Sequence, residues 1–170
     1  MILKGRVHLT VVGYETVGHR GYAKLFRKKA QDLGVAAQLD WKESALAWRE
    51  MLVCIRQADV GLSLVPVSTQ DSNEKWMVGA SNKPFEYLAC GLALLVPDSA
   101  EWRQAYVNPG YGRACEAGDP RSIEKELLWF LEHPAEMRAM GERGRQRVLQ
   151  EWNYETQFAP VLSRMEGGVK

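Results

Sequence analysis

The sequence lacks the features of a membrane-spanning or disulfide-stabilised protein. Its apolar runs, such as Leu92 to Pro97, are far shorter than the ~20 residues that cross a bilayer, and no signal-peptide pattern opens it. Only three cysteines occur, Cys54, Cys90 and Cys115, and none has a Cys-x-x-Cys spacing. We therefore expect free thiols and a cytoplasmic location.

A charge excess of one sign is also missing. The 22 Lys and Arg residues face 21 Asp and Glu residues, a formal charge of +1, so the balance indicates no nucleic-acid partner. His8, His19 and His133 have no ligand-like spacing, and no Gly-x-Ser-x-Gly motif is present. The sequence thus supports neither a metal site nor hydrolase chemistry.

The segment from Gly13 to Arg20 imitates a phosphate-binding P-loop but lacks its chemistry. His19 and Arg20 stand where a P-loop has Lys and then Ser or Thr. Two interpretations of Gly13 remain, a structural turn between strand and helix or part of a loop that lines a ligand.

The 170 residues, 46% of them hydrophobic, suit one globular domain. Apolar runs that read as strands alternate with amphipathic segments that read as helices, which predicts an α/β fold with a Rossmann-like parallel sheet and helices on both faces. Val67 to Ser81 reads as an irregular loop, and loops of this length in compact domains are often functional. We expect strands at Arg6–Gly13, Val35–Trp41, Asp59–Pro66, Leu92–Pro97 and Gly112–Cys115, and helices at Gly21–Leu33, Ser44–Gln57, Pro84–Cys90, Glu101–Val107, Pro120–Glu132, Pro134–Glu151 and Tyr154–Met165.

The segment from Ser81 to Gly91 carries the most chemistry. Free backbone N–H groups and the helix dipole make the start of its helix suitable for a diphosphate, and Lys83 adds a positive charge there. Glu86 lies one turn further on, where a carboxylate can accept hydrogen bonds from ribose hydroxyls. Alternatively, Ser81 or Asn82 only caps the helix, and Lys83 and Glu86 are solvated.

The sequence SNKPFEYLACGLALLVPD, with IRQADVGLSLVP before it and GYGRACEAGDPRSI and EWNYETQF after it, resembles the C-terminal, nucleotide-sugar-binding domain of retaining GT-B glycosyltransferases of the GT4-like group. The resemblance covers nearly the whole chain, with its pieces in the family's order. It implies that Glu86 binds the ribose, that the backbone around Ala80, Ser81 and Asn82 faces the diphosphate and that Lys83 assists. It places Trp41 beside the nucleotide base, although Trp41 could equally pack in the core.

The sequence departs from this family at two places. The common E-x7-E pattern has a glutamate where this chain has Val78, which leaves recognition of the donor sugar open. Family members also have a strand and helix before the VVG strand, and an N-terminal domain that binds the acceptor. We therefore expect residues 1–170 to form a single donor-binding domain, a fragment that is inactive alone.

The resemblance implies transfer of a sugar from a UDP-sugar or GDP-sugar to a saccharide or lipid-linked acceptor, as in polysaccharide biosynthesis. It implies no metal and no further cofactor, and it assigns no catalytic residue to this chain. The alternative is a non-catalytic Rossmann-like binding or interaction module, which a salt-bridged Glu86 on an outer helix face would favour. The closing helix and an arginine-rich helix face (Arg138, Arg143, Arg145 and Arg147) permit peripheral attachment at the inner membrane face. The base, sugar, acceptor and oligomeric state stay open.

Overall fold

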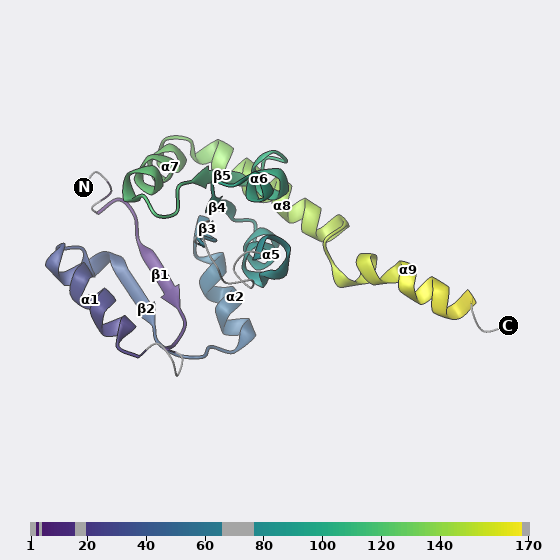
Figure 1. Cartoon of the computed structure of the whole chain (residues 1–170), viewed down its shortest axis with the longest axis horizontal. Helices are drawn as coiled ribbons and strands as arrows, with labels where there is room; N and C mark the ends of the chain where they lie inside the picture. Colours follow the sequence, from purple (N-terminus) through teal and green to yellow (C-terminus); the bar gives the residue numbers. More distant parts are fainter. Residues whose placement is uncertain (1–2, 4, 16–19, 66–76, 168–170) are drawn as a thin grey trace. The chain divides into compact units, whose positions relative to one another are not determined.

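The computed structural model describes residues 3, 5–15, 20–65 and 77–167 (Figure 1). The chain forms two compact units, Met1–Ala58 and Asp59–Lys170. Each unit has its own parallel sheet and its own helices, and each is described by itself.

The first unit is a βαβα arrangement around two strands. It contains β1 (Leu9–Val12), α1 (Tyr22–Asp32), the 3-10 turn η1 (Ala36–Gln38), β2 (Leu39–Lys42) and α2 (Trp48–Arg56). β1 pairs in parallel with β2 in a register that sets Leu9 opposite Leu39. The chain leaves α1 through Gly34, whose φ of 65° lies in the left-handed region that glycine adopts without strain.

The second unit is a three-stranded parallel sheet in the order β3-β4-β5, flanked by helices. Its strands are β3 (Val60–Leu62), β4 (Ala93–Pro97) and β5 (Gly112–Cys115). The helical elements are α4 (Met77–Ala80), α5 (Asn82–Ala89), α6 (Ala100–Trp102), the π-helical turn η2 (Arg103–Val107), α7 (Pro120–Glu132), α8 (Pro134–Gln150) and α9 (Tyr154–Gly167).

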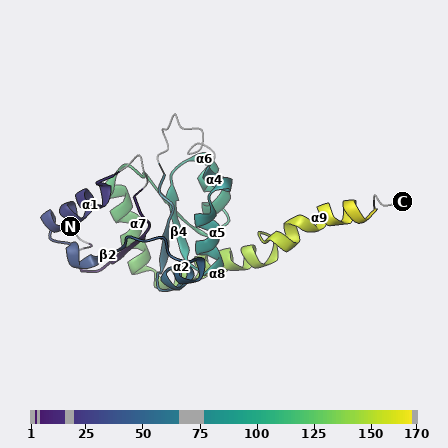
Figure 2. The ribbon, with the colours of Figure 1, turned by 90° about the horizontal axis from the view of Figure 1, so that it is seen from below.

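The core of the second unit lies on both faces of β4, every residue of which is buried. Leu94 and Val96 pack on one side with Leu88 of α5 and Tyr106 of η2. Ala93 and Leu95 pack on the other side with residues that include Phe130 of α7 and Met137 of α8. Figure 2 shows α5 and α7 on opposite sides of β4, the layering that alternating strands and helices predict.

The α/β class with parallel strands and flanking helices is confirmed. The described strands form two parallel sheets, with β1 and β3 each at an edge.

Several element boundaries differ from the sequence prediction. α4 occupies Met77–Ala80, inside the segment predicted as a loop. The sequence did not predict this helix, because four residues are too few to show helical periodicity. The predicted strand Val35–Trp41 begins as the turn η1, and the helix predicted from Ser44 begins only at Trp48. The helix predicted at Glu101–Val107 is α-helical only as far as Trp102 and then widens to a π-helix.

The end of the chain runs along α8 into α9. Figure 1 shows α9 projecting beyond α8, away from the sheet of its unit. Asn153 stabilises the junction: its Nδ2 donates to the Leu149 carbonyl at 2.9 Å and its Oδ1 accepts from Thr156 N at 2.8 Å. Among the described helices, none combines the length and apolar character that crossing a bilayer requires.

Candidate functional site

The start of α5 is built by a serine cap. Ser81 has an extended backbone, and its hydroxyl oxygen accepts a hydrogen bond from Lys83 N at 3.4 Å. Of the two capping residues that the sequence left open, Ser81 is therefore the cap and Asn82 is the first helical residue. Ala80 ends α4 directly before it, so Ala80, Ser81, Asn82 and Lys83 form one continuous stretch at this helix start.

The orientation of α5 is fixed by three aromatic or aliphatic side chains. The ring of Tyr87 fills the space where a Cβ at Gly61 of β3 would stand, and Leu88 does the same at Gly144 of α8. Phe85 packs edge-on against Trp152, with ring centroids 5.4 Å apart. Because these contacts anchor the helix on one side, its other side faces outward.

Asn82, Lys83 and Glu86 lie on the unanchored side of α5. Asn82 and Lys83 are exposed and Glu86 is half-buried. None of these three side chains makes a hydrogen bond or ion pair with another residue that the structure describes. Glu86 is therefore not salt-bridged to a described residue, and the capped helix with unpaired Lys83 and Glu86 fits both interpretations that the sequence left open.

The electrostatics of this helix start suit an anion next to a hydroxyl-bearing group. The first-turn N–H groups and the positive end of the dipole favour negative charge, and Lys83 adds a mobile cation. The carboxylate of Glu86 stands three residues beyond Lys83, near enough for one ligand to meet both. Burial, with a further contribution from the Glu86 charge, raises the pKa of Tyr87, so this phenol stays neutral.

Gly13 and Trp41 come together in the first unit. Trp41 Nε1 donates to the Gly13 carbonyl at 3.3 Å, and Gly13 N donates to the Lys42 carbonyl at 3.2 Å. The Trp41 ring also packs against Tyr22 and Phe26 of α1, with centroids 5.6 and 5.3 Å away. The core-packing role of Trp41 is thus observed, and its place beside a nucleotide base stays a prediction.

Tyr106 is a residue of this region that the sequence analysis missed. Its hydroxyl donates to the carbonyl of Val78 at 2.5 Å, which joins η2 to α4 just before the helix start. Burial raises the pKa of Tyr106 to about 12, so the hydroxyl keeps its proton and stays a donor. Val78 occupies the position where the resemblance expects a glutamate, and its backbone carbonyl oxygen accepts the hydrogen bond from Tyr106. No sequence signal pairs these residues, because they belong to different elements.

Ser63 is the second residue that the sequence analysis missed. Only 5% of its surface is exposed, and its hydroxyl has no hydrogen-bond partner among the described residues. It follows β3 two residues after Gly61, so it lies on the α5 side of the sheet. A buried hydroxyl without a partner carries an energetic cost.

Some predicted features lie outside the described residues. These are residues 66–76 of the expected loop, with Glu74 among them, and residues 16–19 of the glycine-rich turn, with His19 among them. Within the described ranges, no three His, Cys, Asp or Glu side chains gather as metal ligands. The expectation that no metal is needed stays untested.

Comparison with known proteins gives a family match and a set of solved structures. The family model described as "Glycosyl transferase-like" matches residues 4–163. A search of curated protein sequences finds no match.

Three of the similar solved structures share 14–17% sequence identity with the chain, which supports the fold alone. Anabaena HepE in complex with UDP matches at 14% identity and TM-score 0.71, over 94% of this chain and 41% of its own. The C-terminal domain of the glycosyl transferase group 1 family protein LpcC from Francisella tularensis matches at 15% identity and TM-score 0.71. The match covers 86% of this chain and 70% of LpcC's solved chain. Sucrose-phosphate synthase from Thermosynechococcus elongatus matches at 17% identity and TM-score 0.69. The match covers 96% of this chain and 39% of the synthase chain. The chain spans about two fifths of the first and third of these proteins, and their folds agree with a GT-B C-terminal domain.

Proposed function

Because the chain belongs to the glycosyl transferase-like family, we propose that it binds the nucleotide-sugar donor of a GT-B sugar transfer reaction. The donor is a UDP-sugar or GDP-sugar, and the acceptor is a saccharide or a lipid-linked saccharide. The reaction retains the anomeric configuration, takes place in the cytoplasm and requires a second, acceptor-binding domain. The 170 residues alone are therefore inactive as a transferase.

One observation carries this proposal: Asn82, Lys83 and Glu86 face outward at a capped helix start without a partner among the described residues. Charged side chains that are held by a well-packed helix and left unpaired can meet a ligand without first losing a protein contact. Anabaena HepE, which shares the fold, was solved in complex with UDP.

Each group has a distinct role in the proposed site. The backbone N–H groups at Ser81 and Asn82 and the Lys83 ammonium stabilise the negative charge that grows on the departing diphosphate. The Glu86 carboxylate accepts hydrogen bonds from the vicinal ribose hydroxyls and so fixes the position of the sugar carbon that reacts. Trp41 is assigned to the base on the resemblance alone, and Gly13 is assigned to a loop that lines the ligand. No step of this scheme uses a metal.

Isothermal titration of the 170-residue chain with UDP and with GDP tests the proposal. We expect one of the two nucleotides to bind, and Glu86→Ala to weaken binding by about 1–3 kcal/mol through the lost charged hydrogen bonds. Glu136→Ala, which removes an exposed carboxylate from α8, is the matched control and should bind like the wild type. Equal affinities of wild type and Glu86→Ala would reject the ribose role and favour a non-catalytic module.

A further inference from the structure

The two units of the chain carry opposite net charge. Residues 1–58 contain ten Lys and Arg against five Asp and Glu, a net charge of +5. Residues 59–170 contain twelve Lys and Arg against sixteen Asp and Glu, a net charge of −4. The overall balance of +1 therefore conceals a strongly basic first unit.

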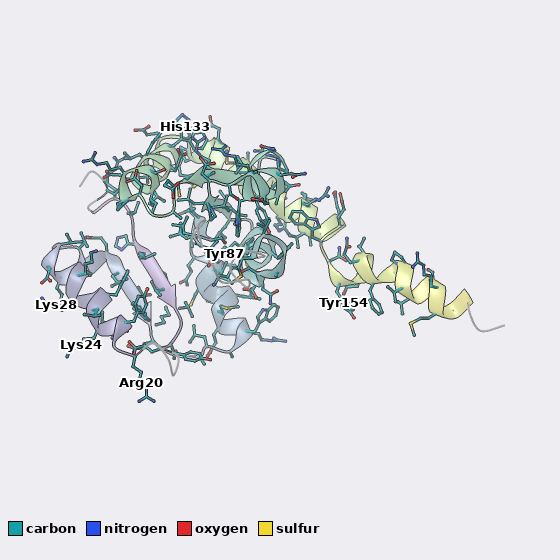
Figure 3. All side chains as sticks on the ribbon, viewed as in Figure 1. Arg20, Lys24, Lys28, Tyr87, His133 and Tyr154 are labelled. Carbon is teal, nitrogen blue, oxygen red and sulfur yellow. The ribbon has the colours of Figure 1, made fainter. Side chains whose placement is uncertain are left out.

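Much of this positive charge lies on the exposed side of α1. Ala23 and Ala30, two turns apart, are the buried residues of the helix and mark its inner side. Lys24, Lys28 and Lys29 are exposed, and Figure 3 shows Arg20, Lys24 and Lys28 following one another along the outer side of α1, away from β1 and β2.

The ion pairs near α1 leave most of these lysines free. Lys28 pairs with Asp32 at 2.9 Å, while Lys24 and Lys29 have no partner among the described residues. Arg27 is different, because it pairs with Glu43 at 2.7 Å and lies over the Trp41 ring.

Apolar side chains stand among these lysines. Leu25 is 69% exposed and is the neighbour of Lys28 and Lys29 at the i+3 and i+4 positions. Tyr22 at the start of α1 and Leu33 at its end are 56% and 49% exposed. Covering the exposed Leu25 side chain with an apolar layer would remove its surface from water, which is favourable.

We propose that the outer face of α1, defined by Lys24, Leu25, Lys28 and Lys29, binds the surface of an anionic lipid bilayer. The lysines attract anionic headgroups, and the Leu25 side chain inserts at the boundary between headgroups and acyl chains. A nucleic acid offers the same phosphates but no apolar layer for Leu25, so the combination favours a membrane. The inference rests on α1 alone and is independent of the nucleotide-sugar proposal.

The sequence analysis named two other places for membrane attachment, the closing helix and the arginine-rich face of α8, and both stay predictions. The arginines of α8 are largely engaged: Arg143 donates to the Gly110 carbonyl at 3.0 Å, Arg145 pairs with Glu142 and Arg147 pairs with Glu151. On the outer face of α1, the exposed Leu25 stands beside Lys29, which has no partner among the described residues.

Co-sedimentation of the full 170-residue chain with lipid vesicles tests the proposal. We expect sedimentation with vesicles of equal parts phosphatidylglycerol and phosphatidylcholine, none with pure phosphatidylcholine, and weaker binding as salt is added. The triple variant Lys24→Gln, Lys28→Gln, Lys29→Gln should lower the partition coefficient by about tenfold or more, since each lysine near the surface contributes about fivefold. Leu25→Ser, which keeps the charge, should lower it several-fold.

The matched control is the triple variant Arg121→Gln, Lys125→Gln, Arg138→Gln, which removes three exposed cations from the second unit. It should bind vesicles like the wild type, and circular dichroism should show that both triple variants are folded. Absence of binding to the anionic vesicles, or equal losses in the two triple variants, would overturn the proposal. Tighter binding to a single-stranded oligonucleotide than to vesicles, with no effect of Leu25→Ser, would show a polyanion site in its place.

Discussion

The two units of the chain differ in how much they bury. Among the described residues of the first unit, the buried hydrophobic ones are Ala23, Ala30 and Ile55, and neither β1 nor β2 contains a buried residue. In the second unit β4 is buried along its whole length, between two hydrophobic clusters. A strand becomes fully buried only when strands flank it and helices cover both faces, and β4 alone meets that condition among the described strands.

This difference bears on function. The second unit holds α5 rigidly, with side chains locked against β3, α8 and Trp152, and so presents Lys83 and Glu86 on a stable support. The first unit packs aromatic side chains around Trp41, and both units leave large apolar side chains exposed, such as Leu25 in the first and Met165 in the second.

The largest expected difference in the free energy of unfolding comes from replacing one leucine with alanine in each unit. Leu94→Ala removes a side chain with no exposed surface from the second unit and should lower the free energy of unfolding by about 2–5 kcal/mol. Leu25→Ala alters a residue that is 69% exposed and should change it by less than about 0.5 kcal/mol. Urea denaturation of the two variants measures this, and similar losses would contradict the contrast in burial.

A glycine substitution should have the next largest effect. A Cβ at Gly141 of α8 would collide with the carbonyl of Gly91, so Gly141→Ala should cost about 1–3 kcal/mol of unfolding free energy. Gly79→Ala in α4 meets nothing within 4 Å and should be neutral or slightly stabilising. Thermal melting compares the two, and a stable Gly141→Ala would mean that α8 is not packed this closely.

The first unit should respond to acid at Glu15. Hydrogen bonds from the N–H groups of Ala23 and Gly21, at 2.6 and 2.8 Å, lower the pKa of this carboxyl below its ordinary 4.5. Its stabilising effect on the start of α1 is thus fully present above pH 4.5 and is lost as the pH falls through the lowered value. The protection factors for hydrogen exchange at the Gly21 and Ala23 amides should fall on acidification more in the wild type than in Glu15→Gln. The same pH response in both proteins would exclude this carboxylate as the cause.

The last expected difference between the units concerns thiol reactivity, which leaves the stability of the fold unchanged. Burial, with nearby carboxylates, raises the pKa of Cys115 from 9.0 to about 11, so its thiolate fraction at pH 8 falls by about 100-fold. Cys54 in the first unit is only half-buried. Iodoacetamide should therefore label Cys115 last in the folded protein and at the same rate as the others in urea. Rapid labelling of native Cys115 would show that the core of the second unit opens.

The sequence predicted elements best where local chemistry marks both ends. α7 spans the predicted Pro120–Glu132, with Asp119 as its capping residue and Pro134 starting the next helix. Edge strands were overestimated: β3 covers Val60–Leu62 of a predicted run from Asp59 to Pro66. An apolar run indicates burial, but pairing with a neighbour determines how much of it is strand.

The candidate site was predictable to the extent that its residues are close in sequence. The spacing of Ser81, Lys83 and Glu86 predicted a capped helix start with two charges beside it, and the structure has that cap. The contacts of Trp41 with Tyr22 and Phe26, and of Tyr106 with Val78, join separate elements. Side-chain contacts of this kind follow from packing in three dimensions, which no local spacing encodes.

The most direct test of the central claim, that Glu86 binds the ribose of the donor nucleotide, is a comparison of UDP with 2′,3′-dideoxy-UDP. Calorimetric titration of wild type and Glu86→Ala with both ligands gives the coupling energy between the carboxylate and the ribose hydroxyls. We predict that the wild type prefers UDP by about tenfold or more, since a hydrogen bond to a charged group contributes roughly 1.5–3 kcal/mol, and that Glu86→Ala loses this preference. An unchanged preference in Glu86→Ala would contradict the claim.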